Sequence, residues 1–424
     1  MAINTNYLEQ EMRNFRIYWL LLFWRPVISE EAVPYPVILI PGDGGSQIEA
    51  KLSKENVVHY ICSKKSDYFS LWLNLELLVP IVIDCWVDNM RLYYDNVSRT
   101  TSNSPGVEIR VPGFGDTLTV EWLDPSKASP GAYFNKIADS LALLGLERNF
   151  TIRGIPYDFR KAPNENIDLF SNLKNIIEET ADRTGKPVVI VAHSMGAPNS
   201  LYFLNKQTSG WKKKYIKSLV TLAGCWGGTV KALKVFAQGD NLGVSVLSEA
   251  TLREEQRSNP SLAWLMPSKH FWAIDEPLVK TANKSYGVGS YEEFFKDINY
   301  PDGYDMWLDT KDLIPDLSPP DVEVHCLYGT GIETVESLFY SKDLPFGKAK
   351  LLTTLDGDGT VNLRSLEGCK RWIGKQRDPV YTRELMGRDH MAVLADPVVL
   401  AYINALVTGI DPNTVIGLET NEIN

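Results

Sequence analysis

A serine between small residues, at the end of an apolar run, is the first candidate for chemistry in this chain. The run Val188–Ala192 is rich in β-branched residues, which predicts a buried parallel strand. It leads into the peptide Ala192-His-Ser-Met-Gly196, and residues 197–206 can continue as a helix. A strand, a tight turn and a helix, with small residues two positions before and after Ser194, favour a nucleophilic serine over an ordinary small-residue turn.

This spacing has a chemical reason. A serine in a strained strand-to-helix turn exposes its hydroxyl, and its neighbours at −2 and +2 must be small to avoid a clash. The helix that follows offers N–H groups and the positive end of its dipole to an oxyanion. This arrangement is the nucleophile elbow of α/β-hydrolases, so we expect that fold, with Ala192 in place of the commoner glycine.

An α/β-hydrolase carries its acid and then its histidine after the serine. Of the five histidines, His390 fits the base best, because it lies in the polar loop 387–391 before a last helix. His325 falls inside an expected strand, which is more typical of a packed residue. The loop LDGDGTV at 355–361 carries the candidate acid, although a turn or a cation loop would have a similar sequence. These patterns leave Asp356 and Asp358 both open.

A glycine-rich turn lies well upstream of the elbow. Residues 35–40 predict a short buried strand that breaks into Pro41-Gly-Asp-Gly-Gly45. In α/β-hydrolases such a turn, after an early central strand, supplies the second N–H of the oxyanion hole. An ordinary strand-to-loop turn is the alternative, but the order along the chain favours the oxyanion role.

The rest of the chain alternates between helical and strand patterns. Apolar residues at helical spacing predict a helix over 169–184, and 215–222 and 323–328 are predicted strands. This alternation predicts an α/β fold with a mostly parallel, doubly wound sheet. We expect residues 34–424 to form one α/β-hydrolase domain, in which 231–320 is a cap insertion over the carboxyl edge of the sheet.

A second insertion is expected at residues 60–96, where apolar residues gather between Cys62 and Cys85. A disulfide between these two cysteines would close a local loop. The segment is either part of the core or an amphipathic, membrane-binding lid, and its composition favours neither. For the lid, the candidate docking residues are Trp72, Leu73, Leu75, Leu77 and Leu78.

Residues 1–33 form a possible signal or targeting segment. The apolar run 15–24 is interrupted by Arg16 and is too short to span a bilayer, so no transmembrane span is expected. Glu9 and Glu11 differ from the positive start of a signal peptide, and no cleavage site is obvious. A divergent signal peptide, an amphipathic anchor and an artefact of the gene model are the three alternatives.

Composition and charge exclude some classes of protein. A net charge of −10 over 424 residues lacks the basic footprint of a protein that binds nucleic acid. Five cysteines without a CxxC pair give no basis for a structural zinc site, and no metal is expected. Glycosylation sequons at Asn96, Asn149 and Asn283, together with the cysteine pairing, favour an oxidising compartment.

These motifs, taken in order, resemble the lecithin:cholesterol acyltransferase family from about residue 34 to about residue 409. The stretches that carry the resemblance are PVILIPGDGGSQIEAKL, VVHYICSKK, WLNLELLVPIVIDCW, RVPGFG, EWLDPSK, PYDFRKAPNEN, VAHSMG, HCLYGTG and DGDGTVNLRS. So many matches in one order make the resemblance specific, rather than a likeness of fold alone.

The resemblance implies a role for each candidate of the site. It implies Ser194 as the nucleophile, Asp358 as the acid and His390 as the base. The backbone N–H groups of Asp43 and Met195 would form the oxyanion hole.

The resemblance also implies the cysteine pairing. The family's two disulfides map onto Cys62–Cys85 and Cys326–Cys369, which leaves Cys225 free. Four departures bear on substrate preference and packing rather than on the reaction: Gly44, Ser46, Cys225 and Phe159, where the family usually has Leu, Asn, Pro and Trp.

A member of this family is expected to be a serine acyl hydrolase and transacylase, without a cofactor. It would work at a phospholipid membrane surface and cleave fatty-acyl esters of glycerophospholipids through an acyl-enzyme. The acyl group would pass to water or to a lipid alcohol acceptor such as ceramide.

Two other functions compete with this reading. Asp43 favours the family's lysosomal members over its plasma sterol acyltransferases, which carry Cys there, and sterol O-acyltransferase activity is the alternative. A catalytically silent lipid-binding protein is disfavoured by the intact triad. The expected location is lysosomal or extracellular.

Overall fold

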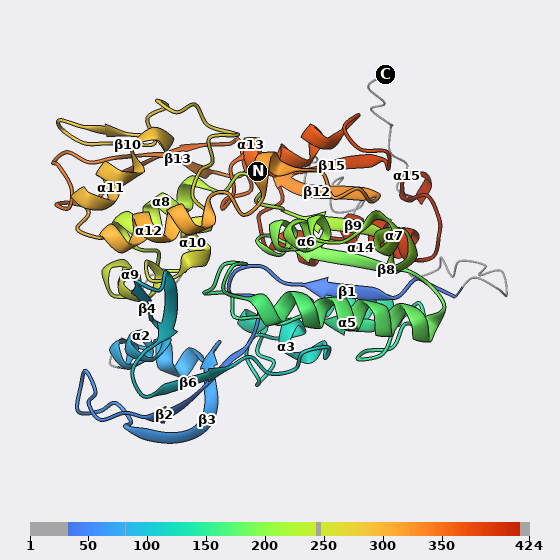
Figure 1. Ribbon diagram of the computed structural model, residues 1–424, viewed down its shortest axis with the longest axis horizontal. Coiled ribbons are helices and arrows are strands. Elements are labelled where there is room, and N and C mark those ends of the chain that lie inside the picture. Colours follow the sequence, from blue (N-terminus) through green and yellow to red (C-terminus); the bar gives the residue numbers. More distant parts are fainter. Residues whose placement is uncertain (1–32, 81, 243–246, 416–424) are drawn as a thin grey trace, which may run out of the picture. The chain divides into compact units, whose positions relative to one another are not determined.

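Six parallel strands form the central sheet of the protein, seen here in a computed structural model that describes residues 33–80, 82–242 and 247–415. Every neighbouring pair in the order β15-β12-β9-β8-β1-β7 is parallel (Figure 1). The strands are β1 Val37–Ile40, β7 Ile152–Gly154, β8 Val188–His193, β9 Ile216–Leu222, β12 Val324–Thr330 and β15 Val380–Met386.

The strands at the centre of this sheet are apolar because both of their faces are covered. All four residues of β1 and all six of β8 are buried. Continuous Val, Ile and Leu runs are typical of parallel strands packed on both faces, whereas a half-exposed strand alternates. The strand predicted at 188–192 is therefore confirmed. The strands predicted at 215–222 and 323–328 are confirmed too, and lie at 216–222 and 324–330.

The chain reverses direction across the sheet at β1. It runs from β1 to β7 at one edge, returns to β8 on the other side of β1, and continues outward through β9, β12 and β15. A crevice at the carboxyl ends of the strands where the order reverses is the usual ligand site of such sheets. The predicted doubly wound, mostly parallel sheet is confirmed.

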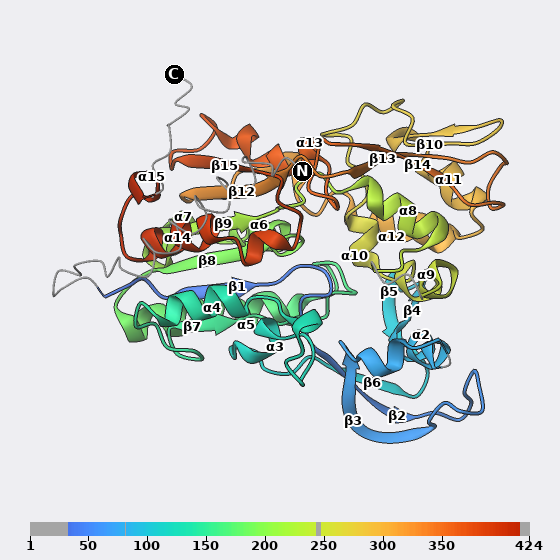
Figure 2. The same cartoon turned by 180° about the vertical axis from the view of Figure 1, so that it is seen from behind.

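Helices pack on the two faces of the sheet. The first group, two of whose helices are joined by the stacked rings of Phe170 and Phe203, lies on the face seen in front in Figure 1. On the face seen in front in Figure 2, Ser140 donates to Asn404 at 2.9 Å. The first group is α5 Ile167–Thr184, α6 Gly196–Asn205 and α7 Ser209–Tyr215; the second includes α4 Asn135–Ala142 and α14 Pro397–Val407.

A small three-stranded sheet carries the segment expected to be the lid. The strand order in this sheet is β3-β2-β6. Between β3 and β6 the chain forms a 3-10 helix η1, a helix α2 and a hairpin β4–β5. The module therefore draws on residues on both sides of 60–96. Its elements are β2 Ile48–Ser53, β3 Lys65–Trp72, η1 Leu75–Leu78, α2 Ile83–Met90, β4 Leu92–Asp95, β5 Thr100–Asn103 and β6 Val107–Arg110.

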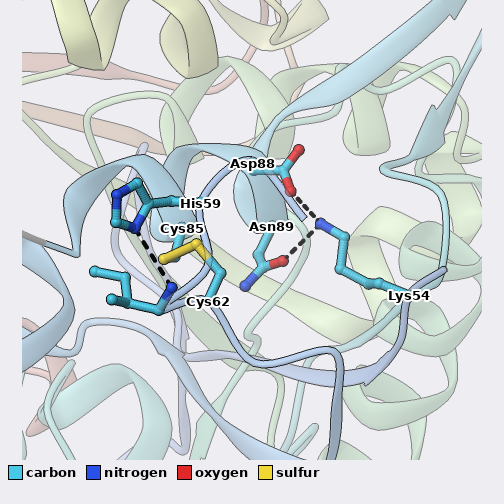
Figure 3. Close-up of a disulfide and its surroundings, with 7 residues drawn as sticks. Lys54, His59, Cys62, Cys85, Asp88 and Asn89 are labelled. Carbon is cyan, nitrogen blue, oxygen red and sulfur yellow. Dashed lines mark hydrogen bonds and ion pairs between the residues drawn. A yellow bond between two sulfur atoms is a disulfide. The ribbon is translucent and has the colours of Figure 1, made fainter. Parts of the chain in front are cut away.

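A disulfide and a buried lysine fasten α2 to the rest of this module. Cys62 is joined to Cys85, with their Cα atoms 5.5 Å apart. Figure 3 shows Lys54 beside this bond, where its ammonium pairs with Asp88 and donates to Asn89 at 2.9 Å. Because this ammonium is buried, both partners are needed to offset its desolvation.

Among the described residues, the region expected to be a cap holds five α-helices and part of a four-stranded sheet. The four-stranded sheet β11-β10-β13-β14 combines two short strands from 231–320 with a hairpin from beyond it. The elements are α8 Val230–Gln238, α9 Glu249–Gln256, α10 Pro260–Trp264, β10 Val279–Lys280, β11 Ser285–Tyr286, α11 Tyr291–Asp297, α12 Pro301–Thr310, β13 Thr334–Phe339 and β14 Lys350–Thr354.

The remaining short elements connect these layers. They are α3 Leu118–Glu121, η2 Ser129–Gly131, η3 Val288–Ser290, η4 Pro315–Leu317, α13 Leu363–Leu366, η5 Glu367–Trp372, η6 Ala392–Leu394 and α15 Pro412–Val415. All the helices and strands named above belong to one compact unit that begins at Tyr35. The segment 1–33, predicted as a targeting segment, lies almost wholly outside the described residues. In the part of the chain that is described, no helix is both long enough and apolar enough to cross a membrane.

Candidate active site

Ser194 lies in the turn between β8 and α6, at the carboxyl end of a central strand. Its φ is +52°, a left-handed conformation that is rare for a residue with a side chain. Its own N–H donates to Leu222 O at 2.9 Å, which fixes the turn to the neighbouring strand. A Cβ at Gly196 would lie 2.4 Å from Ile40 O, so the small residue required at +2 has a steric cause. Ala192, at −2, is fully buried and its methyl is accommodated.

Ser194, His390 and Asp358 form one hydrogen-bonded relay. His390 Nε2 lies 2.9 Å from Ser194 Oγ, and His390 Nδ1 lies 2.7 Å from Asp358 Oδ2. An ionised carboxylate can only accept, so Nδ1 carries the proton and Nε2 accepts from the serine hydroxyl. This is the tautomer that a general base next to a serine needs.

Backbone contacts hold the acid in place. Asp358 is fully buried, and its Oδ1 accepts from Thr360 N at 3.0 Å and from Val361 N at 2.8 Å. Its carbonyl accepts from His390 N at 2.8 Å, so the loops that carry acid and base are joined directly. Asp356 is exposed and makes no such contact with the histidine. The structure thus places Asp358 beside His390 and Asp356 away from it.

The glycine-rich turn after β1 lies against the nucleophile. A Cβ at Gly42 would lie only 2.6 Å from Ser194 Cβ, so no side chain fits there. In the described part of the chain, the N–H groups of Asp43 and Met195 donate to no protein acceptor. Two unpaired amides beside a serine are the arrangement that an oxyanion hole requires.

The Asp43 carboxyl has an unusual protonation equilibrium. Solvent reaches this side chain, but the protein surrounds it closely, and desolvation raises its pKa from 3.8 to about 6. The positive charge of Lys231, near the start of α8, and a hydrogen bond from Gly44 act in the opposite direction. Desolvation is the larger effect, so the carboxyl is neutral in acidic conditions.

Cys225, the free cysteine, contacts the site. Its thiol is buried and interacts with the Ser194 side chain, and desolvation raises its pKa to about 12. A thiol with this pKa stays protonated, which makes it a weak nucleophile. The other four cysteines are paired as predicted: Cys62 is joined to Cys85, and Cys326 to Cys369.

The five predicted docking residues have different environments. Leu73 and Leu78 are buried in the core, with Leu73 N donating to Leu123 O. Leu75 is 40% exposed and Leu77 is half-buried. The structure therefore limits a docking surface on η1 to Leu75 and Leu77, joined by the exposed Val79.

Trp72 has a contact that the sequence did not indicate. Its ring packs on Trp86 and Phe159, and its Nε1 donates to Gly44 O at 2.7 Å. It therefore contacts the glycine-rich turn 41–45, called the oxyanion turn below, instead of standing free on the surface. No local pattern connects residues 28 positions apart, so only the fold brings this pair together.

All three sequon asparagines are exposed. Asn96 lies in the turn between β4 and β5. The Asn149 side-chain oxygen accepts from Thr117 N at 2.9 Å, and Asn283 Nδ2 donates to Asp343 at 2.7 Å. A glycan on Asn283 would be attached through this same nitrogen, which keeps one hydrogen after glycosylation.

Serine, histidine and aspartate in one relay at the carboxyl edge of a doubly wound parallel sheet define an α/β-hydrolase. The family model described as lecithin:cholesterol acyltransferase matches residues 68–397. The chain belongs to the lecithin:cholesterol acyltransferase family, which confirms the resemblance inferred from its motifs.

Curated relatives align over nearly the whole chain. It is 48% identical over 404 residues to "Lysosomal phospholipase A and acyltransferase" of Rattus norvegicus, covering 94% of this chain and 97% of the relative. The protein of the same name from Homo sapiens is 46% identical over 396 residues, covering 93% and 95%. "Phosphatidylcholine-sterol acyltransferase" of Gallus gallus is 43% identical over 380 residues, covering 88% and 92%.

Proposed function

We propose that this protein is a serine acyl hydrolase and transacylase that cleaves fatty-acyl esters of glycerophospholipids. The observation that carries the proposal is the Ser194–His390–Asp358 relay, with contacts of 2.9 and 2.7 Å. The names of two relatives, from Rattus norvegicus and Homo sapiens, supply the substrate class, a phospholipid. The lysosome or the extracellular space is the corresponding location.

The reaction proceeds in two halves through an acyl-enzyme. His390 takes the proton of Ser194 as the hydroxyl attacks the ester carbonyl, and Asp358 stabilises the imidazolium that forms. The N–H groups of Asp43 and Met195 donate to the tetrahedral oxyanion, an interaction worth about 3–4 kcal/mol per donor in other serine hydrolases. His390 then protonates the leaving alcohol, and water or a lipid alcohol such as ceramide takes the acyl group in the second half.

The charges around the site suit a phospholipid. Lys231 lies near Asp43 and 3.8 Å from Asp240, and its ammonium is partly exposed. An ammonium at the mouth of the site can pair with the phosphate of a glycerophospholipid whose ester carbonyl reaches Ser194. Burial of Leu75 and Leu77 of η1 in a bilayer would bring this mouth to the lipid surface.

Sterol O-acyltransferase activity is the second candidate, supported by the relative from Gallus gallus. The two candidates share the acyl-enzyme and differ only in the acceptor. Asp43 supports the first, because a carboxyl with a pKa of about 6 is neutral in an acidic compartment and adds no negative charge beside the oxyanion.

The decisive experiment measures products rather than substrate loss. Purified protein is incubated with phosphatidylcholine liposomes, alone or with ceramide or cholesterol, from about pH 4 to 8, and the acyl products are identified by mass. We expect free fatty acid and acylceramide, and neither from Ser194→Ala, because both products pass through one acyl-enzyme. Acyl transfer that survives in Ser194→Ala would rule out the shared intermediate, and cholesteryl ester as the main product would favour the second candidate.

A further inference from the structure

A second histidine, His193, lies beside the triad and takes no part in the reaction above. It ends β8, it is 1% exposed, and its ring centroid is 4.8 Å from that of His390. Both of its nitrogens have partners: Nδ1 lies 2.5 Å from the Tyr133 hydroxyl, and Nε2 lies 2.9 Å from the backbone oxygen of His390.

The direction of each of these hydrogen bonds can be assigned. A carbonyl oxygen only accepts, so His193 Nε2 carries a proton and donates it to His390 O. Burial lowers the pKa of His193 well below its ordinary value, so the ring is neutral and Nδ1 is an acceptor. The Tyr133 hydroxyl therefore donates to Nδ1, and its oxygen accepts from Gly42 N at 2.9 Å.

The result is a continuous chain of three hydrogen bonds under the site. It begins at Gly42 of the oxyanion turn, passes through Tyr133 and His193, and ends at the backbone of His390. The Gly42 amide donates to Tyr133, whereas the next amide, that of Asp43, has no acceptor among the described residues. Engaging the His390 carbonyl fixes the loop whose imidazole must meet Ser194.

We propose that His193 and Tyr133 are positioning residues that set the distance between the oxyanion turn and the catalytic His390. This inference rests on the proposed function. An oxyanion donor and a general base must act on the same tetrahedral intermediate, and a displacement of about 1 Å in such a geometry can cost about 100-fold in rate. This chain of hydrogen bonds, called the bridge below, joins both the oxyanion turn and the loop of His390 to the end of β8, the strand that leads into Ser194.

The protein contains a matched control for this bridge. His325 of β12 is 2% exposed, and its Nδ1 and Nε2 lie 2.9 Å from the Tyr402 hydroxyl and from Glu323 Oε1. His325 of the central sheet and Tyr402 of α14 therefore form a buried histidine–tyrosine pair, and neither makes a hydrogen bond to the triad. Changes to this pair measure what the loss of such a hydrogen bond does to stability alone.

The test compares kcat and KM on a soluble p-nitrophenyl ester with the thermal melting temperature. We expect Tyr133→Phe to lower kcat about 10- to 100-fold with KM within about twofold, because only the transition state needs both loops in register. Tyr402→Phe should lower the melting temperature comparably and leave kcat within about twofold of wild type. Equal kcat losses from Tyr133→Phe and Tyr402→Phe would overturn the proposal.

Substitutions of His193 separate the two ends of the bridge. The side-chain amide of a glutamine lies near the position of Nε2 and can still donate to His390 O. Leucine can neither donate to His390 O nor accept from Tyr133. We expect His193→Gln to recover at least about fivefold of the kcat lost in His193→Leu. We also expect Tyr133→Phe combined with His193→Leu to lose no more kcat than the worse single variant, since one bridge is broken once. Additive losses would mean that the two residues act separately and would overturn the bridge.

The failure of this inference is distinguishable from failure of the proposed function. Wild-type protein whose ester turnover does not depend on Ser194 would overturn the proposed function, and the bridge with it. Ser194-dependent turnover in the wild type, with full kcat in a folded Tyr133→Phe variant, would overturn the bridge alone.

Discussion

The indole nitrogen of Trp72 donates a hydrogen bond to the carbonyl oxygen of Gly44 at 2.7 Å. This bond joins the segment expected to dock on lipid to the turn that carries Asp43. Trp72 ends β3, and η1 with its exposed Leu75 begins three residues later. Trp72 therefore links the residues that lead into η1 to the turn that carries Asp43.

Removing this bond should affect catalysis rather than lipid binding. Trp72→Phe keeps a ring against Trp86 but loses the donor, so Gly44 O is left with one partner fewer. We expect kcat to fall about 3- to 10-fold on both liposomes and a soluble ester, in line with about 1 kcal/mol for a neutral hydrogen bond. Liposome sedimentation should be unchanged. Weaker sedimentation with normal soluble-ester turnover would return Trp72 to a docking role.

Leu75 should contribute to lipid binding. Its side chain is already partly buried, so transferring the remainder into lipid is worth about 1 kcal/mol. We expect Leu75→Ser to weaken liposome sedimentation about fivefold and to leave the melting temperature nearly unchanged. Leu143→Ser is the matched control, because Leu143 is 88% exposed and follows α4, away from η1. Equal weakening by both variants would show that the effect is not local to η1.

The two aspartates of the DGDG loop should behave differently. Asp358 is buried and bonded to His390, so Asp358→Asn favours the wrong imidazole tautomer and should lower kcat by about 10⁴-fold. Asp356→Asn changes an exposed carboxylate and should stay within about threefold of wild type. Steady-state kinetics on a soluble ester checks both. Similar losses in the two variants would leave the acid unassigned.

Asp43 should make activity fall as the pH rises. Its carboxyl is neutral below its pKa of about 6 and becomes an anion above it, beside the amide that serves the oxyanion. We expect kcat to drop about tenfold between pH 5 and 7.5, equivalent to roughly 1.4 kcal/mol of added repulsion. Asp43→Asn should remove most of this drop. An unchanged pH–rate profile in Asp43→Asn would assign the basic limb to another group.

The same carboxyl affects stability with a definite sign. Because its pKa is raised on folding from 3.8 to about 6, the folded protein keeps a proton that the unfolded chain has released between those values. The free energy of unfolding therefore decreases as the pH rises through this range. Thermal melting of Asp43→Asn should exceed that of the wild type by more at pH 7 than at pH 4.

Local sequence predicted the parts of this protein whose physical cause is local. The small residues around Ser194 and the apolar run before it reflect one turn and one buried strand, and both lie within ten residues. Chain order and a comparison of the five histidines predicted His390, whereas only the resemblance to the family favoured Asp358 over Asp356. The helix predicted at 169–184 lies at 167–184, because its apolar spacing is a property of one face.

Other features depend on contacts between distant segments, which local patterns do not record. β10 has two residues and owes its existence to pairing with β13, more than fifty positions later. Tyr133 reaches Gly42 across 91 residues of chain. Leu73 and Leu78 lie in a segment with the composition of a docking surface, but both are buried in the hydrophobic core. Hydrophobicity identifies residues that avoid water without saying whether lipid or protein covers them.

The positions around the nucleophile differ in which substitutions they can accommodate. Positions 42 and 196 are closed to any side chain, since an added Cβ would meet Ser194 or the backbone of β1. Residue 43 is open, because its side chain reaches solvent while only its backbone amide is needed by the oxyanion. We therefore expect homologous proteins to differ at position 43, where a substitution can change the pH dependence of activity without displacing Ser194.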